Sequence, residues 1–308
     1  MPTDVRGVAR TLAPAKVNLA LYVGPKRLDG FHELVTIFQA ISLADEVEVE
    51  VMAPAREGQA DEAIRLIVEG PDLGPVEENL AWRAAKAFAV EARLDRHVSI
   101  RLRKTIPAGA GLGGGSSDAA AVLRCLAYLT DFDDAPRLTE IAAGLGSDVA
   151  FFLGSSPTAI GRGRGEQIQP VEALPSRPIA VALPPVHVAT GPAYRALDAS
   201  RVDHETVQLP GMGAVVSWNG LLGGGGINDF EAIVAERHEP VAKSLAAMRS
   251  AGAAFAMLSG SGAASFALFD ESVDAVRAEA WCDGLSNSLG WSIVPCTTLE
   301  HMPEVIPM

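Results

Sequence analysis

The sequence predicts an α+β protein of two domains. Its 308 residues suit two domains of ordinary size, or one large domain. Some segments carry apolar residues at every second position and others at three-to-four spacing, the patterns of half-buried strands and amphipathic helices. In the second half these segments alternate as expected over an antiparallel sheet. The prolines Pro170, Pro175 and Pro178 mark a change in composition, so we place a domain boundary between residues 172 and 173.

The composition argues against several classes of protein. Hydrophobic residues make up 48% and charged residues 20%, as in globular proteins with a large core. The net charge of −13 argues against nucleic-acid or membrane-surface partners. No apolar run approaches the ~20 residues of a membrane span, and the first residues do not resemble a secretory signal. The separated cysteines Cys125, Cys282 and Cys296 fit buried thiols of a cytoplasmic protein, which we expect to be a monomer or weak homodimer.

The first half is expected to contain strands and helices in alternation after a loose lead-in over residues 1–12. The expected elements are strands at 15–23 and 47–51, a hairpin loop at 53–62 with its returning strand at 64–68, a helix at 79–94, a strand at 98–103, helices at 117–129 and 138–144, a helix opening at 146–152, and a strand from 159 to about 171. In the first strand, Lys16 and Asn18 share the face opposite the apolar residues.

The second half is expected to contain a buried strand at 179–183 and helices from residue 229, interrupted at Pro240. Residues 199–226 are rich in glycine and polar residues, and we expect them to be mobile. Two strands joined by a tight glycine turn are expected over 254–269. A helix at 272–281 and a strand at 291–298 complete the chain.

The most informative stretch runs from Pro107 to Ser117, where five of eleven residues are glycine. It joins an expected strand to the start of an expected helix. Glycines let backbone amides turn inward, and the helix N-terminus adds a partial positive charge, so this stretch is suited to binding a phosphate group. A tight turn with a good helix cap is the plainer interpretation, but such a turn needs only one or two glycines.

The spacing of Gly109, Gly111 and Gly114 also matches a dinucleotide-binding fingerprint. That fold needs a following strand that ends in an acidic residue, and residues 131–136 are turn-like instead. A Walker loop needs a lysine directly after the glycines, and none follows here. The motifs of protein kinases are also missing. A different type of nucleotide loop therefore remains.

Three motifs resemble those of the kinase superfamily that includes galactokinase, homoserine kinase and mevalonate kinase. The glycine-rich stretch resembles its ATP loop, residues 13–19 resemble its first motif, and residues 258–263 its third. The resemblance implies an N-terminal domain like domain 2 of ribosomal protein S5 and a ferredoxin-like C-terminal domain. It also implies an ATP-dependent kinase acting on a small molecule.

Within the superfamily, four further segments resemble the kinases of 4-diphosphocytidyl-2-C-methyl-D-erythritol in the non-mevalonate isoprenoid pathway. These segments are residues 29–34, 146–152, 165–166 and 228–231. The family's reaction is phosphorylation of the 2-hydroxyl of a substrate that carries cytidine diphosphate. Phe31 stands where that family often has tyrosine, which keeps a stacking face and loses a hydroxyl. Ala150 replaces a common proline.

The resemblance assigns catalytic roles to Asp148 and Lys16. Asp148 would accept the proton of the substrate alcohol, and Lys16 would keep that carboxylate ionised and offset charge on the transferring phosphoryl group. The plainer interpretations are a helix cap for Asp148 and a solvated strand face for Lys16.

The same resemblance implies the binding residues. Substrate contacts are expected from Asn18, Phe31, His32 and Thr190, with His32 at the pyrimidine edge. ATP contacts are expected from Pro107, Ala108, Gly109, Ala110, Gly111, Leu112, Gly113, Gly114, Gly115, Ser116, Ser117, Asn79 and Lys104. For Asn79 and Lys104, helix capping and a solvated strand end are the alternatives. Ser117 would help to orient Mg²⁺, while ATP supplies most ligands of the metal, because we see no dedicated carboxylate cluster.

Three other functions are considered. Another kinase of the superfamily would act on mevalonate or homoserine, which have no nucleobase for the Phe31-His32 pair. A non-catalytic ligand sensor would lack the base or the lysine, and both are present. A nicotinamide oxidoreductase would need the acid-terminated strand that the sequence does not show.

Overall fold

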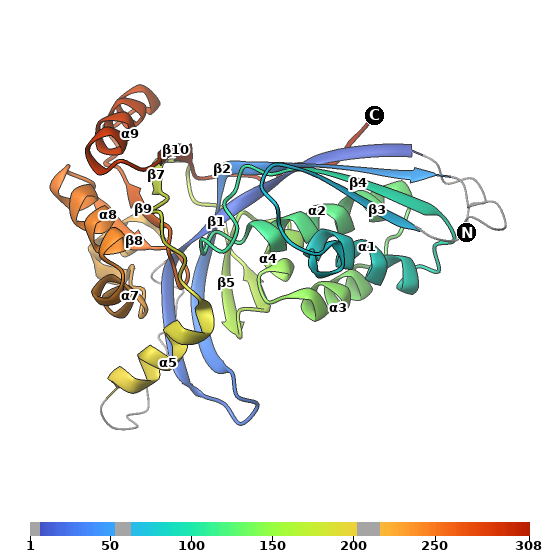
Figure 1. The fold of residues 1–308 in the computed structure, drawn as a ribbon, viewed down its shortest axis with the longest axis horizontal. Helices are drawn as coiled ribbons and strands as arrows, with labels where there is room; N and C mark the ends of the chain where they lie inside the picture. The colour runs from blue at the N-terminus through green and yellow to red at the C-terminus, as the bar shows by residue number, and fades with distance from the viewer. Residues whose placement is uncertain (1–6, 53–62, 202–215) are drawn as a thin grey trace.

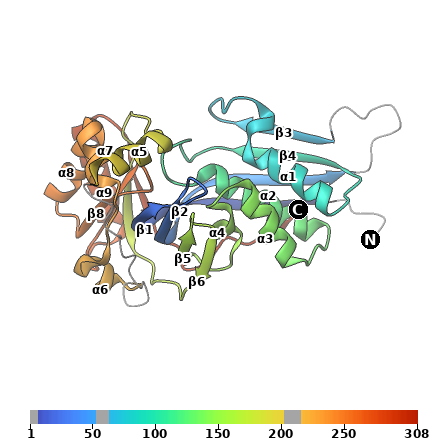
Figure 2. The same ribbon diagram turned by 90° about the horizontal axis from the view of Figure 1, so that it is seen from below.

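The computed structural model describes residues 7–52, 63–201 and 216–308. These residues form two lobes, each built on its own sheet (Figure 1). The two views agree that the helices within residues 80–153 gather at one end of the molecule, whereas those at 190–200 and within 231–289 gather at the other (Figure 2). We call the part with the seven-stranded sheet the first lobe and the part with the four-stranded sheet the second lobe.

The first lobe is built on two unusually long strands, β1 (Gly7–Lys26) and β2 (His32–Met52), which pair antiparallel. The sheet runs in the order β11-β1-β2-β4-β3, and β5 pairs with both β2 and β6. The remaining strands are β3 (Ile64–Glu69), β4 (His97–Arg103), β5 (Thr158–Gly163), β6 (Gln167–Pro170) and β11 (Ile306–Pro307). In β2 the valines Val47, Val49 and Val51 are buried and the glutamates between them face outward, as alternation predicts.

Four helices cover one face of this sheet (Figure 1). They are α1 (Leu80–Glu91), α2 (Gly114–Leu129), α3 (Ala135–Leu145) and α4 (Val149–Leu153), and a short 3₁₀ turn, η1 (Val76–Glu78), precedes α1. The alanine-rich helix α2 is the most buried, since small side chains let it lie close to β1. This packing places the start of α2 near the middle of the molecule.

The second lobe has a four-stranded antiparallel sheet in the order β10-β7-β9-β8. Its strands are β7 (Pro178–Ala182), β8 (Phe255–Leu258), β9 (Ser265–Leu268) and β10 (Ile293–Thr297). Its helical elements are α5 (Thr190–Ser200), α6 (Trp218–Gly220), a π-helical turn η3 (Leu221–Gly225), α7 (Glu231–Arg237), α8 (Glu239–Ser250) and α9 (Ala275–Leu289). Helices α8 and α9 pack on one face of the sheet.

The other face of the second sheet packs against β1 and β2, so the two lobes share one hydrophobic cluster. Val17 and Ile37 from the long strands contact this cluster together with Val181 and Phe266. Isolated bridges join Leu21 to Asn228 and Ile41 to Thr298 across the lobes. The predicted α+β class with two domains is confirmed, and the boundary at 172/173 stays a prediction.

Several expected elements differ in detail. Residues 7–12 belong to β1 rather than to a loose lead-in, because Ala9 and Thr11 point inward while Arg10 and Leu12 point outward. The strand at 64–69 does not pair with β2, as the returning strand of a hairpin would. It pairs in parallel with β4, which lies between it and β2. The expected hairpin loop at 53–62 lies outside the described residues. The stretch from 159 to 171 is two paired strands, not one.

The glycine-rich region before Asn228 also differs from expectation. Its part at 202–215 lies outside the described residues, but residues 218–225 form helical turns with Trp218 and Leu221 buried. The three cysteines are buried thiols, as predicted. Within the described ranges, no helix has the length and apolar character needed to cross a membrane.

Candidate active site

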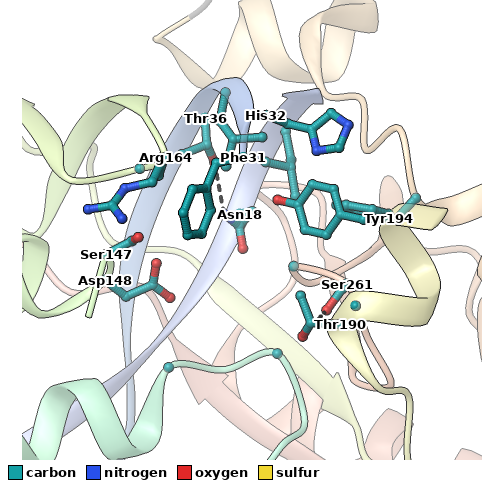
Figure 3. A pocket seen from close by; sticks show the side chains of 18 of the residues that line it. Asn18, Phe31, His32, Thr36, Ser147, Asp148, Arg164, Thr190, Tyr194 and Ser261 are labelled. Carbon is teal, nitrogen blue, oxygen red and sulfur yellow. Dashed lines mark hydrogen bonds between the residues drawn. The ribbon is translucent and has the colours of Figure 1, made fainter. Parts of the chain in front are cut away.

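A cavity of about 650 Å³ opens between the two lobes. It is bordered by β1 and β2, by the start of α4, by the β5–β6 turn, by α5 and by the glycine turn after β8 (Figure 3). Ten of its side chains are labelled there: Asn18, Phe31, His32, Thr36, Ser147, Asp148, Arg164, Thr190, Tyr194 and Ser261. The four expected substrate-binding residues and both expected catalytic residues line this one cavity.

Lys16 lies at the inner wall of the cavity, and its side chain is only 4% exposed. Its ammonium lies 3.6 Å from Asp148 Oδ2 and donates hydrogen bonds to Asn18 Oδ1 at 2.7 Å and to Gly111 O at 3.0 Å. Burial lowers the pKa of Lys16 below its usual 10.5, while the charge of Asp148 opposes this shift. One cation therefore joins the predicted base to the glycine-rich loop.

Asp148 precedes α4, where the plainer interpretation makes it a helix cap. Its carboxylate makes no capping hydrogen bond to the helix. Asp134, by contrast, caps α3 by accepting a hydrogen bond from Arg137 N. Because the Asp148 side chain is 30% exposed and lines the cavity, its carboxylate is available to a bound molecule.

The glycine-rich loop turns sharply before α2. Gly109, Gly111 and Gly113 have φ values of +68°, +82° and +73°, which residues with a side chain rarely adopt. A Cβ atom at Gly113 would lie 2.9 Å from the ring of Phe152 and 3.1 Å from Lys16 Cγ. The backbone amide of Lys16 donates to Leu112 O at 2.9 Å, which ties the loop to β1. Helix α2 starts at Gly114, three residues earlier than expected.

A second glycine turn, residues 259–262 between β8 and β9, meets this loop from the other lobe. Ser259 Oγ donates to Gly111 O at 3.0 Å, and Ala264 N donates to Ala110 O at 3.0 Å. Asn228 Nδ2 donates to the carbonyls of Leu258 and Gly260, each at 2.8 Å. The resemblance had singled out Asn228 without giving it a role, and the structure shows it bracing this turn.

The outer end of the cavity is aromatic. The ring of His32 stacks on that of Tyr194 with centroids 4.9 Å apart, and its Nε2 lies 2.8 Å from Asp198 Oδ1. Phe31 is about half exposed, and the Arg164 guanidinium lies over its ring at 4.9 Å (Figure 3). Sequence reasoning missed Tyr194, Asp198 and Arg164. The first two follow Thr190 by four and eight positions on α5, a spacing that could have found them.

The polar wall between these two ends contains Asn18 and Thr190. Asn18 Nδ2 donates to Thr36 Oγ1 at 2.8 Å, which fixes its amide beside Lys16. Thr190 Oγ1 lies 3.1 Å from Ser261 Oγ, so α5 and the second glycine turn meet at a pair of hydroxyl groups (Figure 3).

The residues expected to bind ATP include some that line the cavity and others that do not. Of the loop residues, Gly111 and Gly113 line the cavity. Asn79 and Lys104 do not line it: Asn79 caps α1 by accepting from Ala81 N, and Lys104 lies beneath the loop. The Lys104 ammonium contacts Asp45 and lies 2.7 Å from Asp118 Oδ2, so it is not a solvated strand end. Sequence reasoning missed Asp45 and Asp118.

Known proteins share both halves of this architecture. Residues 79–155 match the family model of the GHMP kinases N terminal domain, and residues 210–287 match that of the GHMP kinases C terminal. A solved homoserine kinase from Cytophaga hutchinsonii superposes with a TM-score of 0.69 over 99% of each chain, at 17% identity, which shows a shared fold.

More specific relatives have one name in common. A 4-diphosphocytidyl-2-C-methyl-D-erythritol kinase of Anaeromyxobacter dehalogenans is 42% identical over 96% of this chain and 93% of its own. One from Solibacter usitatus is 42% identical over 85% and 81%. A solved 4-(cytidine 5'-diphospho)-2C-methyl-D-erythritol kinase superposes with a TM-score of 0.75 at 35% identity, over 94% of this chain and 98% of that chain. The chain therefore belongs to the 4-diphosphocytidyl-2-C-methyl-D-erythritol kinase family of ATP-dependent small-molecule kinases.

Proposed function

We propose that this chain transfers the γ-phosphoryl group of ATP to the 2-hydroxyl of 4-diphosphocytidyl-2-C-methyl-D-erythritol, a step of the non-mevalonate isoprenoid pathway. The main support is the contact of Lys16 with both partners it needs. Its ammonium lies 3.6 Å from Asp148 Oδ2 and 3.0 Å from Gly111 O of the glycine-rich loop, in the cavity that also contains Phe31 and His32.

In the proposed reaction the alcohol oxygen bonds to the γ-phosphorus while its O–H bond breaks. Asp148 accepts the proton, and the bond between the γ-phosphorus and the bridging oxygen breaks to release ADP. A positioned base of this kind contributes roughly 10²–10⁴-fold to the rate. Lys16 stabilises the negative charge that develops beside it, and its burial strengthens this interaction because little water screens it.

The ATP phosphates would lie on the glycine-rich loop and the N-terminus of α2, whose 16 residues align their backbone dipoles. Mg²⁺ would neutralise part of the phosphate charge when bound. The Ser117 hydroxyl fits a metal ligand at this end of α2, because among the described residues nothing hydrogen-bonds to this buried atom. Most other ligands of the metal would come from ATP and water.

The cytosine ring of the substrate would bind at the aromatic end of the cavity. Asp198 and Tyr194 hold His32 in one orientation, so its ring can meet the edge of a base, and Phe31 offers an exposed face for stacking. Lys26, Arg164 and Arg195 also line the cavity, which favours the diphosphate in a chain that is acidic overall. Asn18 and Thr190 would contact the methylerythritol hydroxyl groups. We place the enzyme in the cytoplasm as a monomer or weak homodimer.

The test is ADP release by the purified protein with Mg-ATP and the cytidylyl substrate, with mevalonate and homoserine as alternative substrates. We expect turnover with the cytidylyl substrate only. Asp148→Asn is expected to lower kcat by about 10²–10⁴-fold while calorimetry still detects Mg-ATP binding.

The matched control is Asp134→Asn, at an aspartate that does cap its helix, and this variant should keep full turnover. Normal kcat in Asp148→Asn would refute the role of the base. Preferred turnover of mevalonate or homoserine would refute the substrate.

A further inference from the structure

A buried group of three ionisable side chains lies directly beneath the glycine-rich loop. Lys104 is 4% exposed, Asp118 is 3% exposed and Asp45 is fully buried. The Lys104 ammonium contacts Asp45 Oδ2 and lies 2.7 Å from Asp118 Oδ2. Ionisable groups are seldom buried without a partner, because removing their charged forms from water is costly. Burial raises the pKa of Asp118 to about 7, although the charge of Lys104 opposes the shift.

The three residues belong to three different elements. Asp45 lies within β2, Lys104 directly follows β4, and Asp118 lies in the first turns of α2. The glycine-rich loop begins after Lys104 and ends before Asp118. The group therefore joins the two ends of the loop to each other and to a central strand.

Asp45 also fixes the chain that enters the loop. Its Oδ1 accepts hydrogen bonds from Thr105 N at 2.5 Å and from Ile106 N at 2.8 Å. These are the last two amides before Pro107, and Asp45 thus determines where the loop starts. Charge-assisted bonds to a buried carboxylate are stronger than neutral ones.

The start of α2 is packed equally closely. A Cβ atom at Gly114 would lie 2.9 Å from Ile106 Cγ2 and 3.4 Å from Lys104 Nζ. The ammonium thus lies just below the first helical residue after the loop, where it also meets Asp118. Among the described residues, the two carboxylates account for all the hydrogen bonds that this ammonium donates.

We propose that Asp45, Lys104 and Asp118 form a clamp that closes the ATP loop from below, in which Lys104 positions the loop rather than binding the nucleotide. The three are positioning residues: they act on ATP through the shape of the loop. The inference rests on the proposed role of the loop as the ATP site. It departs from the expectation that Lys104 contacts ATP.

The two roles of Lys104 predict opposite results for Asp118→Ala. If Lys104 is part of a clamp, removing Asp118 frees one end of the loop, and the KM for ATP rises about tenfold, as for one lost charge-assisted hydrogen bond. The KM for the alcohol substrate stays unchanged. If Lys104 were an ATP ligand, removing Asp118 would release its ammonium, and the KM for ATP would stay constant or fall.

Asp118→Asn and Lys104→Met complete the experiment. The amide of Asp118→Asn keeps an oxygen that accepts from Lys104, so we expect most of the ATP affinity to return. In a double-mutant cycle, adding Lys104→Met to Asp118→Ala should raise the KM for ATP no further, since both substitutions open the same clamp. Additive increases would overturn the proposal, as would an unchanged KM for ATP in a folded Asp118→Ala variant.

Two control variants distinguish an open clamp from a less stable protein and from a loop that does not bind ATP. Arg177→Met removes a buried cation of the second lobe, which pairs with Glu271, and should lower the melting temperature without changing the KM for ATP. A general loss of stability would therefore not imitate the result. If Gly113→Ala bound Mg-ATP as tightly as the wild type, the proposed role of the loop would be wrong, independently of the clamp.

Discussion

The two glycine segments that meet at Lys16 are supported by different kinds of interaction. The loop of the first lobe, residues 107–113, lies above buried charges, since Asp45 holds the amides that lead into it. The turn of the second lobe, residues 259–262, is held mainly by neutral groups: Asn228 Nδ2 binds the carbonyls of Leu258 and Gly260, and Ser259 N donates to Ala264 O at 2.9 Å. Its charged contact lies just before the turn, where Leu258 N donates to Glu231 Oε2 at 2.9 Å.

This difference matches the function that we propose for each segment. A loop that receives phosphates meets strong electrostatic forces, and charged supports resist displacement better than neutral hydrogen bonds do. The second turn meets the loop mainly through backbone and hydroxyl contacts. Both segments contain glycines with positive φ, but only the first lies on a buried group of three ionisable residues.

Among changes to the two segments and their supports, the largest effect is expected where the segments touch. A Cβ atom at Gly111 would lie 2.3 Å from Ser259 O, and the residue has a φ of +82°. Gly111→Ala must therefore push the segments apart and move Lys16, whose ammonium binds Gly111 O. We expect kcat/KM to fall on the order of 10²-fold, as for a displacement of about 1 Å in a catalytic group.

Gly284→Ala is the matched control, because it lies in α9 with no atom within 4 Å of the added Cβ. It should leave kcat/KM unchanged. Equal turnover by Gly111→Ala and the control would show that the two segments need not touch.

A smaller effect is expected from the neutral support. Asn228→Ala removes both donors to the turn and the acceptor of Phe230 N, which leaves buried polar groups unpaired at about 1–3 kcal/mol each. The melting temperature should fall by the same amount near pH 6 and near pH 8, because amides do not titrate there.

Asn287→Ala, on the exposed face of α9, serves as the control for this measurement and should not change the melting temperature. A loss in Asn228→Ala that depends strongly on pH would contradict the view that the Asn228 amide is a neutral support of the turn.

The smallest expected effect is a change of kcat with pH, caused by Lys16, which lies between the two segments. Burial lowers the pKa of Lys16 below 10.5, although the charge of Asp148 opposes the shift. As the pH rises through this lowered pKa, Lys16 loses its proton and its charge, so kcat should fall on the alkaline side at a pH below 10.5. Lys16→Arg is expected to have a lower kcat than the wild type. Because its guanidinium stays charged, that kcat should not change with pH over this range. A matching alkaline fall in both proteins would assign it to another group.

The sequence could single out the proposed catalytic pair because each residue lies in a recognisable motif. Lys16 follows the alternation of a strand, Asp148 opens a helix, and the resemblance assigns both a role. The structure places their charged atoms 3.6 Å apart. That distance could not come from either motif alone, because it depends on how β1 and α4 pack around the glycine-rich loop.

The charged clamp could not be predicted from local pattern. Asp45 precedes a strand of alternating glutamates and valines, where it looks like one more acidic residue of a wet face. Its burial follows from the pairing of β2 with β4, which places it next to Lys104, 59 positions away. The sequence shows that Asp45 is acidic, but only the fold shows that Lys104 is its partner.

Strand order shows the same limit. The apolar alternation at 64–68 predicts a strand correctly, and its nearness in sequence to β2 favours a hairpin. The observed partner is β4, because α1 carries the chain back so that β4 inserts between them. Likewise, the glycines at 223–226 suggest a loose segment, yet nearby Trp218 anchors it by donating to Pro175 O.

The edge of the first sheet has a consequence for the order of assembly during translation. Strand β1 is synthesised long before its edge partner β11, since Thr11 donates to Glu304 O across 293 positions. When every residue of the glycine-rich loop has been synthesised, strand β11, which pairs with this edge of β1, has not. The nascent first lobe therefore keeps an unpaired edge on β1 until the second lobe has also emerged, and during that interval this edge is open to pairing with other chains.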